Sequence, residues 1–279
     1  MALNLQTTKK LNNGIEIPML GLGVFKTPDG RETVDAVRWA LEAGYRHIDT
    51  AAVYRNEAGV GQGIRESGVP RSEIFLTTKL WNADMRADRQ REAFEQSLER
   101  LGTDYVDLYL IHWPVTEKYM ASWKIMEEHY AQGRMRAIGV SNFQMHHIED
   151  LLAGSKVVPS VNQCECHPLL TQVPLRNYCE RLGIVFESWS PLGGTGAGNL
   201  VGNPDIAAIG ARYGKSAAQV MLRWQLQRGN VVITKSVHQD RIIANTQLYD
   251  FELSSDDMQA LFAMNLDQRV GADPDHFPF

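Results

Sequence analysis

The sequence predicts a single α/β domain over residues 1–279, folded as a closed (β/α)8 TIM barrel. Eight strand-like runs are each followed by a helix-like segment. Several of these runs are continuously apolar, as is typical of parallel strands buried on both faces. No linker or low-complexity segment divides the 279 residues, a length that one barrel can occupy. A doubly wound open sheet is the alternative that the same pattern allows.

The chain opens with a predicted β-hairpin, because Asn13-Gly14 lies between two alternating stretches and favours a two-residue type I′ turn. A first barrel strand is expected at 19–23, and a helix over 32–43 that Gly44 ends. An irregular, aromatic-tipped tail over 265–279 could fold over the barrel mouth. The other seven predicted strands are 45–49, 74–79, 106–112, 135–140, 160–164, 184–189 and 231–235. The helices that follow the first five of them are expected at 56–66, 88–101, 118–132, 144–153 and 172–182. Strand 184–189 leads through a glycine-rich loop to two helices at 204–213 and 216–228, and strand 231–235 leads to a helix at 239–247.

Composition argues against several classes of protein. A net charge of −5, a pI near 5.9 and the lack of a basic stripe argue against a nucleic-acid binder. Three cysteines are an odd number and form no disulfide framework, which favours a reducing, cytoplasmic location. No apolar run is long enough to span a bilayer, and the N-terminal residues lack the apolar core of a signal peptide.

Three successive predicted strands end on titratable residues, namely Asp49, Lys79 and His112, and Tyr54 lies in the loop after the first of them. Barrel enzymes place their active sites at the C-terminal ends of the strands. We therefore expect these four side chains to meet. Tyr54 would be a general acid, with a pKa lowered by Lys79, while Asp49 holds Lys79 charged.

His112 would donate a hydrogen bond to the oxygen that receives the proton. Two alternatives remain open on the residues alone. His112 could itself be the acid, because its ordinary pKa lies closer to neutrality. The Asp49–Lys79 pair could instead be a structural ion pair, with Tyr54 as a wall residue.

A proton donor implies a partner that supplies hydride, yet no convincing Gly-x-Gly-x-x-Gly fingerprint is present. The glycines within 59–63 have the wrong spacing and lie in a helical pattern, which indicates helix packing. The better anion site follows the last strand, where Lys235, Ser236 and Arg241 open a helix. A solvated helix start is the simpler explanation of the same residues.

Polar residues at other strand ends fit an amide-bearing ring, namely Ser141, Asn142 and Gln163. Trp189 could stack on such a ring, and Ser190 could bind phosphates of the molecule that carries the ring. A tryptophan at a strand end is, however, more often a packing residue. Three further aromatic residues follow strand ends, where they would line an apolar pocket or cap the barrel core: Phe25, Trp81 and Trp113.

A metal site is not predicted. Cys164 and Cys166 share one face of a strand, but no second Cys/His pair completes a tetrahedral site. The remaining candidates, His146, His147 and His276, are interpreted as surface histidines.

Four motifs of the chain are specific when taken together: 44–54 (Gly-Tyr-Arg-His-Ile-Asp-Thr-Ala-Ala-Val-Tyr), 108–114 (Leu-Tyr-Leu-Ile-His-Trp-Pro), 138–143 (Ile-Gly-Val-Ser-Asn-Phe) and 233–236 (Ile-Thr-Lys-Ser), with Arg241 and Asn245. With these motifs the chain resembles the aldo-keto reductases over nearly its whole length, and in particular the bacterial and protozoan branch with 2,5-diketo-gluconate reductases and trypanosomatid prostaglandin F synthases. Relatives often have proline at Thr234 and glutamate at Ala244, and many mammalian relatives have tryptophan at Phe25.

The resemblance implies a barrel that opens with a β-hairpin and carries two extra helices. It implies NADPH-dependent reduction of aldehydes and ketones, with Tyr54 as the acid and a small-molecule carbonyl as the only partner of a monomer. Reduction of a prostaglandin endoperoxide, or non-catalytic NADPH binding like that of potassium-channel beta subunits, are the alternatives. The cofactor-binding positions that it implies are Gly23, Ser141, Asn142, Gln163, Trp189, Ser190, Leu192, Lys235, Ser236, Val237, Arg241 and Asn245.

Overall fold

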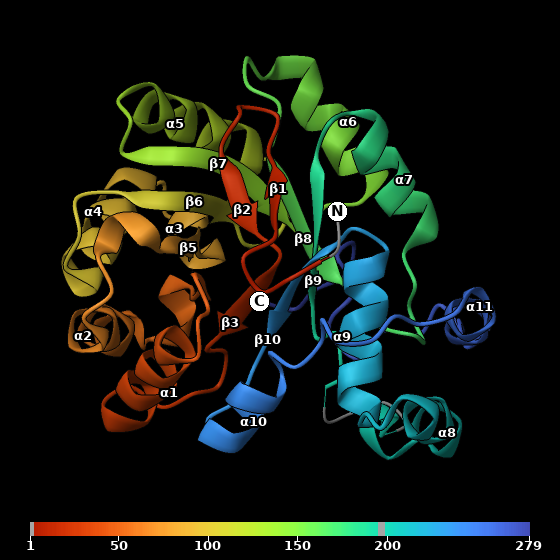
Figure 1. The fold of residues 1–279 in the computed structure, drawn as a ribbon. Helices are drawn as coiled ribbons and strands as arrows, with labels where there is room; N and C mark the ends of the chain where they lie inside the picture. The colour runs from red at the N-terminus through yellow and green to blue at the C-terminus, as the bar shows by residue number, and fades with distance from the viewer. Residues whose placement is uncertain (1–2, 195–198) are drawn as a thin grey trace.

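The computed structural model describes residues 3–194 and 199–279, and eight parallel strands in it close into a barrel (Figure 1). The first and last strands pair through Leu20 and Val232, which completes the ring and excludes the open-sheet alternative. The barrel strands in chain order are β3 (Leu20–Gly23), β4 (His47–Asp49), β5 (Phe75–Leu80), β6 (Val106–Ile111), β7 (Met135–Ser141), β8 (Val161–Glu165), β9 (Val185–Trp189) and β10 (Val231–Thr234).

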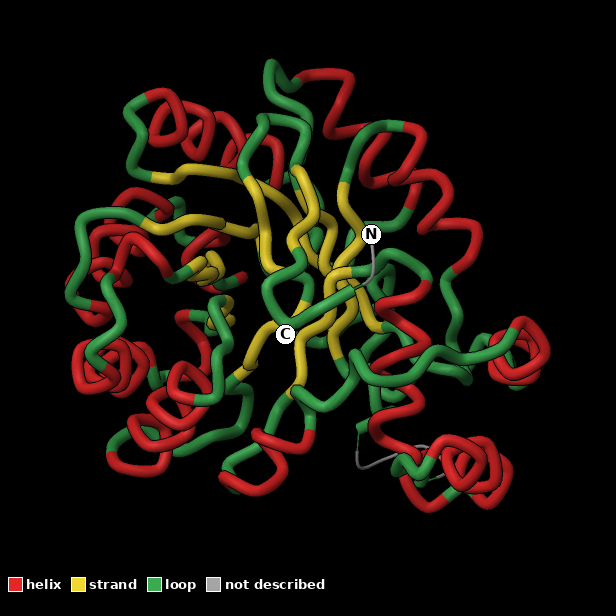
Figure 2. The backbone as a smooth tube through the Cα atoms, in the orientation of Figure 1, coloured by secondary structure: helices red, strands yellow, loops and turns green. Residues whose placement is uncertain are grey.

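Helices surround the strands, as the tube in Figure 2 shows. The helix predicted over 239–247 ends at residue 244. The structure also has a helix over 255–263, a segment for which the residue pattern predicted none. The helices that follow the barrel strands are α1 (Arg31–Glu42), α2 (Glu57–Ser67), α4 (Gln90–Leu101), α5 (Tyr119–Ala131), α6 (Met145–Gly154), α7 (Val173–Arg181), α9 (Ala217–Gln227) and α10 (Gln239–Ala244). The additional ones are the two longer helices α8 (Pro204–Tyr213) and α11 (Ser255–Ala263), the short α3 (Asn82–Arg86), and the 3₁₀ turns η1 (Ala52–Tyr54), η2 (Arg71–Glu73) and η3 (Leu200–Gly202).

The predicted N-terminal hairpin is present as β1 (Thr8–Lys10) and β2 (Glu16–Pro18), but its turn type was wrong. The Leu11 amide donates to the Ile15 carbonyl at 2.8 Å, so the loop has three residues. Gly14 has a φ of 89° and Asn13 is not in the positive-φ region, unlike a type I′ turn. The Asn13 side chain donates to the Arg136 carbonyl at 3.0 Å, so contact with the barrel shapes this turn.

The hairpin closes the N-terminal end of the barrel. Leu11 and Ile17 are buried in one cluster with Phe75, Leu108 and Val231 from the barrel strands. This apolar layer separates the lower end of the barrel from solvent and leaves the C-terminal strand ends for chemistry.

Glycines in α2 serve helix packing, as the sequence predicted. A β-carbon at Gly61 would overlap the Leu101 carbonyl oxygen of α4, and one at Gly63 would lie 2.8 Å from the Val34 carbonyl oxygen of α1. Both neighbours are backbone atoms that cannot turn aside. The close approach of three helices therefore requires glycine here.

The tail over 265–279 is irregular, as expected. The middle of the predicted glycine-rich loop, 195–198, lies outside the described residues. Within 3–194 and 199–279, no helix combines the length and the apolar character needed to cross a bilayer. The three cysteines are buried free thiols.

Candidate active site

The four predicted catalytic residues gather at the C-terminal ends of adjacent strands. Asp49 is the last residue of β4, and Lys79 is the last but one of β5. His112 follows β6 directly, and Tyr54 ends the 3₁₀ turn η1 after β4. Because β4, β5 and β6 are parallel neighbours, their C-terminal ends meet at one mouth of the barrel.

Asp49 and Lys79 form a buried ion pair. The Lys79 Nζ donates to both Asp49 carboxylate oxygens, at 2.7 and 2.8 Å, and to the Thr50 carbonyl at 2.9 Å. Burial lowers the pKa of Lys79, but the Asp49 carboxylate outweighs it, and the pKa is raised overall. Lys79 is therefore a fixed positive charge beneath the site.

Tyr54 lies against this charge. The Lys79 Nζ is 5.3 Å from the centre of the Tyr54 ring, and the His112 ring is 5.7 Å away. Burial raises the pKa of Tyr54 more than the Lys79 charge lowers it. The expectation of a lowered pKa was therefore wrong in its net direction, because burial removes water from the phenolate and Asp49 offsets the lysine. Tyr54 keeps its proton, and Lys79 reduces the cost of giving it up.

His112 is neutral in this environment. Burial and the Lys79 charge hold the pKa of His112 well below its ordinary value. A group that stays unprotonated at neutral pH is poorly suited to donate a proton as an imidazolium. The electrostatics therefore favour Tyr54 over His112 as the acid, and leave His112 as a neutral hydrogen-bond donor.

Ser141, Asn142 and Trp189 form one hydrogen-bonded group beside His112. Asn142 donates to the His112 carbonyl at 3.0 Å and accepts from the Trp189 indole at 2.9 Å. Ser141 donates to the Gln163 carbonyl at 2.8 Å. Gly271 of the tail lies directly against the Trp189 ring. The predicted amide-binding positions are thus together, and a hydrogen bond to Asn142 holds Trp189 beside them.

Gln163 connects this group directly to the ion pair, and it also bonds Glu187, a residue that the sequence did not suggest. The two bonds share one nitrogen of Gln163. Its Nε2 donates to Asp49 Oδ2 at 2.8 Å and to Glu187 Oε2 at 2.9 Å. Glu187 lies in β9 and is fully buried. Burial, and then the Asp49 charge, raise its pKa to about 8. A glutamate inside the apolar run over 184–189 was the signal that could have found it.

The anion-binding candidates lie around the C-terminal end of β10. Lys235 and Arg241 are exposed, and neither has an ion-pair partner among the described residues. The Ser236 hydroxyl accepts from the His238 amide at 3.1 Å. Because α10 has only six residues, side-chain charge rather than a helix dipole would hold an anion here. Val237 and the buried Asn245 flank this group.

The remaining predicted cofactor positions lie on the neighbouring strands. Gly23 ends β3, and a β-carbon there would lie 2.6 Å from the Ile233 side chain, so the strands approach closely. Ser190, with a φ of 49°, and the half-buried Leu192 follow β9. Because β9, β10 and β3 are adjacent in the ring, these positions form one continuous stretch of the barrel mouth.

Aromatic side chains wall the mouth, and the tail completes the wall. The Phe25 ring is 5.0 Å from Tyr54, and the Trp81 ring is 5.3 Å from His112. Phe279 stacks on Trp81 at 5.6 Å and contacts Trp113 at 5.2 Å. The tail therefore folds over the barrel mouth.

A histidine pair also binds the tail, which corrects one prediction. His147 is buried, not a surface residue, and its Nε2 lies 3.4 Å from Asp275. Its Nδ1 accepts from the Gln144 amide at 3.1 Å, so the proton of the neutral ring lies on Nε2. Although His146, His147 and Asp275 are close enough to share an ion, this proton occupies the position that a metal would need.

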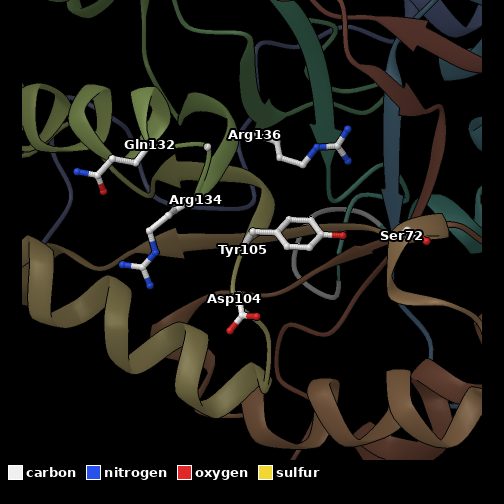
Figure 3. Close-up of a pocket in the computed structure, with 7 residues that line it drawn as sticks. Ser72, Asp104, Tyr105, Gln132, Arg134 and Arg136 are labelled. Atoms are coloured by element: carbon white, nitrogen blue, oxygen red, sulfur yellow. The ribbon is translucent and has the colours of Figure 1, made fainter.

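A hollow of about 610 Å³ lies at the opposite end of the barrel (Figure 3). Its walls lie just before β5 and β6 and around the start of β7, at the N-terminal ends of these strands. Arg136 pairs with Asp107 at 2.7 Å, and Arg134 pairs with Glu95. Their charges are thus already compensated, and this hollow is no rival to the mouth. It is lined by Ser72, Asp104, Tyr105, Gln132, Gly133, Arg134 and Arg136.

Comparisons with known proteins agree with this geometry. The model of the aldo/keto reductase family matches residues 19–265. The chain is 52% identical over 279 residues to glyoxal reductase of Bacillus subtilis (strain 168), with 100% of both chains covered. It is 49% identical over 267 residues to 9,11-endoperoxide prostaglandin H2 reductase of Trypanosoma cruzi (strain CL Brener), covering 96% of this chain and 94% of that one.

A solved structure is also similar. The Bombyx mori aldo-keto reductase in complex with NADP superposes with a TM-score of 0.89 at 38% identity, covering 98% of this chain and 97% of that one. The relatives from Bacillus subtilis and Trypanosoma cruzi confirm the resemblance to bacterial and protozoan members. The chain belongs to the aldo/keto reductase family.

Proposed function

We propose that this protein reduces aldehydes and ketones to alcohols with NADPH, and that Tyr54 donates the proton. The observation that carries the proposal is the geometry around Tyr54. Its ring centre lies 5.3 Å from the Nζ of Lys79, which donates to Asp49 at 2.7 Å, and 5.7 Å from the His112 ring. Burial raises the pKa of Tyr54 and lowers that of His112, which supports Tyr54 as the group that carries the proton. The names of the relatives support carbonyl reduction, and the NADP complex of the Bombyx mori protein supports the cofactor.

The residues at the mouth fit such a cofactor. Both amide hydrogens of Gln163 are bound by carboxyl groups, which leaves its oxygen for a ligand N–H. Lys235 and Arg241 supply two cations for a ribose phosphate that NADH lacks. When bound, the cofactor supplies hydride from C4 of its nicotinamide ring.

The side chains of the chain itself would handle the substrate oxygen and the proton. His112 and Tyr54 would hydrogen-bond the carbonyl oxygen and orient it. Tyr54 would pass its hydroxyl proton to that oxygen as negative charge develops on it. The resulting phenolate would be stabilised by Lys79, whose own proton is held in place by Asp49.

Replacing Tyr54 with phenylalanine tests the proposal. Loss of general acid catalysis typically costs a factor of 10² to 10⁴ in rate, so Tyr54→Phe is expected to lower kcat with glyoxal or methylglyoxal by at least a hundredfold. NADPH binding, followed by protein fluorescence, should stay within about twofold. Tyr105→Phe, at the opposite end of the barrel, is the matched control. Turnover retained in Tyr54→Phe would reassign the acid to His112.

Prostaglandin endoperoxide reduction is the second candidate, and the Trypanosoma cruzi relative favours it. A steady-state panel of aldehydes, α-keto acids, diketo-sugars, quinones and prostaglandin H2 would separate these substrate classes. Tight NADPH binding without turnover on any of them would instead support a non-catalytic role.

A further inference from the structure

We propose that Glu187 is a positioning residue that, together with Asp49, holds both amide hydrogens of Gln163 and so directs the Gln163 oxygen to the NH₂ group of the nicotinamide carboxamide. The inference rests on the proposed NADPH-dependent function and deepens it. It gives a role in cofactor recognition to a residue that would touch neither the cofactor nor the substrate.

The orientation of the Gln163 amide is fixed by its two acceptors. Nε2 lies 2.8 Å from Asp49 Oδ2 and 2.9 Å from Glu187 Oε2. Turning the amide over would bring its oxygen against Asp49 Oδ2, which is bound by Lys79 as a carboxylate and carries no hydrogen to donate. One acceptor would leave the amide free to swing about a single hydrogen bond, whereas two define its plane.

Nothing else in the barrel accounts for a carboxyl group at Glu187. Lys79 is committed to Asp49 and Thr50. His47 Nε2 is 3.7 Å from Glu187 Oε1, beyond hydrogen-bond distance. Burial lowers the pKa of His47 to about 4, so that ring offers no counter-charge. Glu187 Oε1 has no hydrogen-bond partner among the described residues. A buried carboxyl group is costly unless it is hydrogen-bonded, and among the residues that the structure describes the hydrogen bond of Glu187 comes from Gln163.

The protonation state of Glu187 suits this role. With a pKa raised to about 8 by burial and by Asp49, the side chain is mostly neutral at pH 7. It can then accept from Gln163 without adding a second negative charge beside the Asp49–Lys79 pair. A neutral glutamine has the same shape and also presents an acceptor oxygen. Glu187→Gln is therefore the conservative variant, and Glu187→Met removes the acceptor at similar volume.

The experiment measures dissociation constants rather than turnover. NADP⁺ is compared with its 3-acetylpyridine analogue, in which a methyl group replaces the carboxamide NH₂, by titrating protein fluorescence. The wild-type protein should bind NADP⁺ about five- to tenfold more tightly than the analogue, which corresponds to the free energy of one neutral hydrogen bond. Glu187→Met should reduce this preference to less than about twofold, mainly by weakening NADP⁺ binding. Glu187→Gln should keep it.

A second background tests whether Glu187 acts through Gln163. In Gln163→Met, the preference for NADP⁺ should already be lost, and adding Glu187→Met should change it by less than about twofold. An undiminished preference in Glu187→Met would overturn the proposal. Equal loss in Glu187→Gln and Glu187→Met would also overturn it, because repacking of the core would then be the cause. If Glu187→Met does not fold, Glu187→Leu replaces it.

The proposed function fails in a different way. A wild-type protein that binds no NADP⁺, or reduces no carbonyl compound with NADPH, would refute NADPH-dependent reduction itself. A wild-type protein that binds NADP⁺ tightly but does not distinguish the acetylpyridine analogue would leave reduction standing and remove the contact on which the role of Glu187 depends.

Discussion

Replacing Lys79 with methionine is expected to destabilise the protein by an amount that grows with pH. The variant leaves the buried Asp49 without the ammonium that now donates two hydrogen bonds to it, at 2.7 and 2.8 Å. The folded chain avoids an unpaired buried charge by binding a proton. An aspartate in the unfolded chain has a pKa of about 3.9, and each pH unit above it costs about 1.4 kcal/mol. The loss is then about 4 kcal/mol at pH 7 and about 1.5 kcal/mol at pH 5.

Asp49→Asn should have the opposite pH dependence. Lys79 is completely buried, and without the carboxylate its ammonium must lose a proton to remain there. A lysine in the unfolded chain has a pKa of about 10.4, so the loss is about 4.6 kcal/mol at pH 7 and about 2 kcal/mol at pH 9. The first variant thus becomes less stable as pH rises, whereas the second recovers. The double variant contains neither group and should show neither slope.

Urea unfolding followed by circular dichroism at pH 5, 7 and 9 gives the free energies of unfolding for all four proteins. The two single variants should each lose about 3–5 kcal/mol at pH 7, as is usual when one partner of a buried pair is removed. The double variant should lose far less than their sum. Additive losses, or two single variants with parallel pH dependence, would refute the interpretation of Asp49–Lys79 as a mutually dependent charged pair.

Three further predictions follow from the site and the helices around it. Replacing both Lys235 and Arg241 with methionine should weaken NADPH binding ten- to a hundredfold in fluorescence titrations, because charge-assisted hydrogen bonds to a phosphate are lost. NADH binding should stay unchanged. Equal weakening of NADPH and NADH binding would contradict a phosphate site. Because the pKa of His112 is well below its ordinary value, kcat/KM should show no inflection near pH 6.5 between pH 5 and 7.5, and an inflection there would mean that this histidine titrates. Gly61→Ala should lower the free energy of unfolding by about 1–3 kcal/mol through overpacking against Leu101, whereas the exposed Gln62→Ala in the same helix should change it by less than about 0.5 kcal/mol in urea unfolding.

The order of the barrel elements could be predicted from the sequence, because buried parallel strands and the helices between them give different patterns of apolar residues. The strand ends at Asp49 and Lys79 could be placed to within one residue, because each charged residue lies at the end of a short strand-like run. The hairpin turn could not be predicted, because the Asn13 side chain divides its hydrogen bonds between its own loop, where it accepts from the Ile15 amide, and the barrel, where it donates to the Arg136 carbonyl. The second of these contacts comes from a distant part of the chain, so the local turn preference alone did not decide the turn type.

The pKa shifts and buried hydrogen bonds beneath the barrel mouth were harder to predict from the sequence. A lysine beside a tyrosine indicates a lowered pKa, but the extent of burial decides the sign, and burial is a property of the complete barrel. Glu187 escaped notice because both faces of its strand are buried, so no alternation marks it. The burial of His147 was not predicted, since two of the residues packed against it, Tyr119 and Asp275, come from distant parts of the chain.

Closure of the ring also means that the barrel cannot be completed during synthesis until its last strand has been made. Strand β3 finds one of its two partners only when Val231–Thr234 has been synthesised, more than two hundred residues later. Until then the nascent chain has two open strand edges with unpaired N–H and C=O groups, which can pair with other chains. The last strand therefore protects the nascent chain from aggregation, and an incomplete translation product that lacks β10 is the form that chaperones would have to hold.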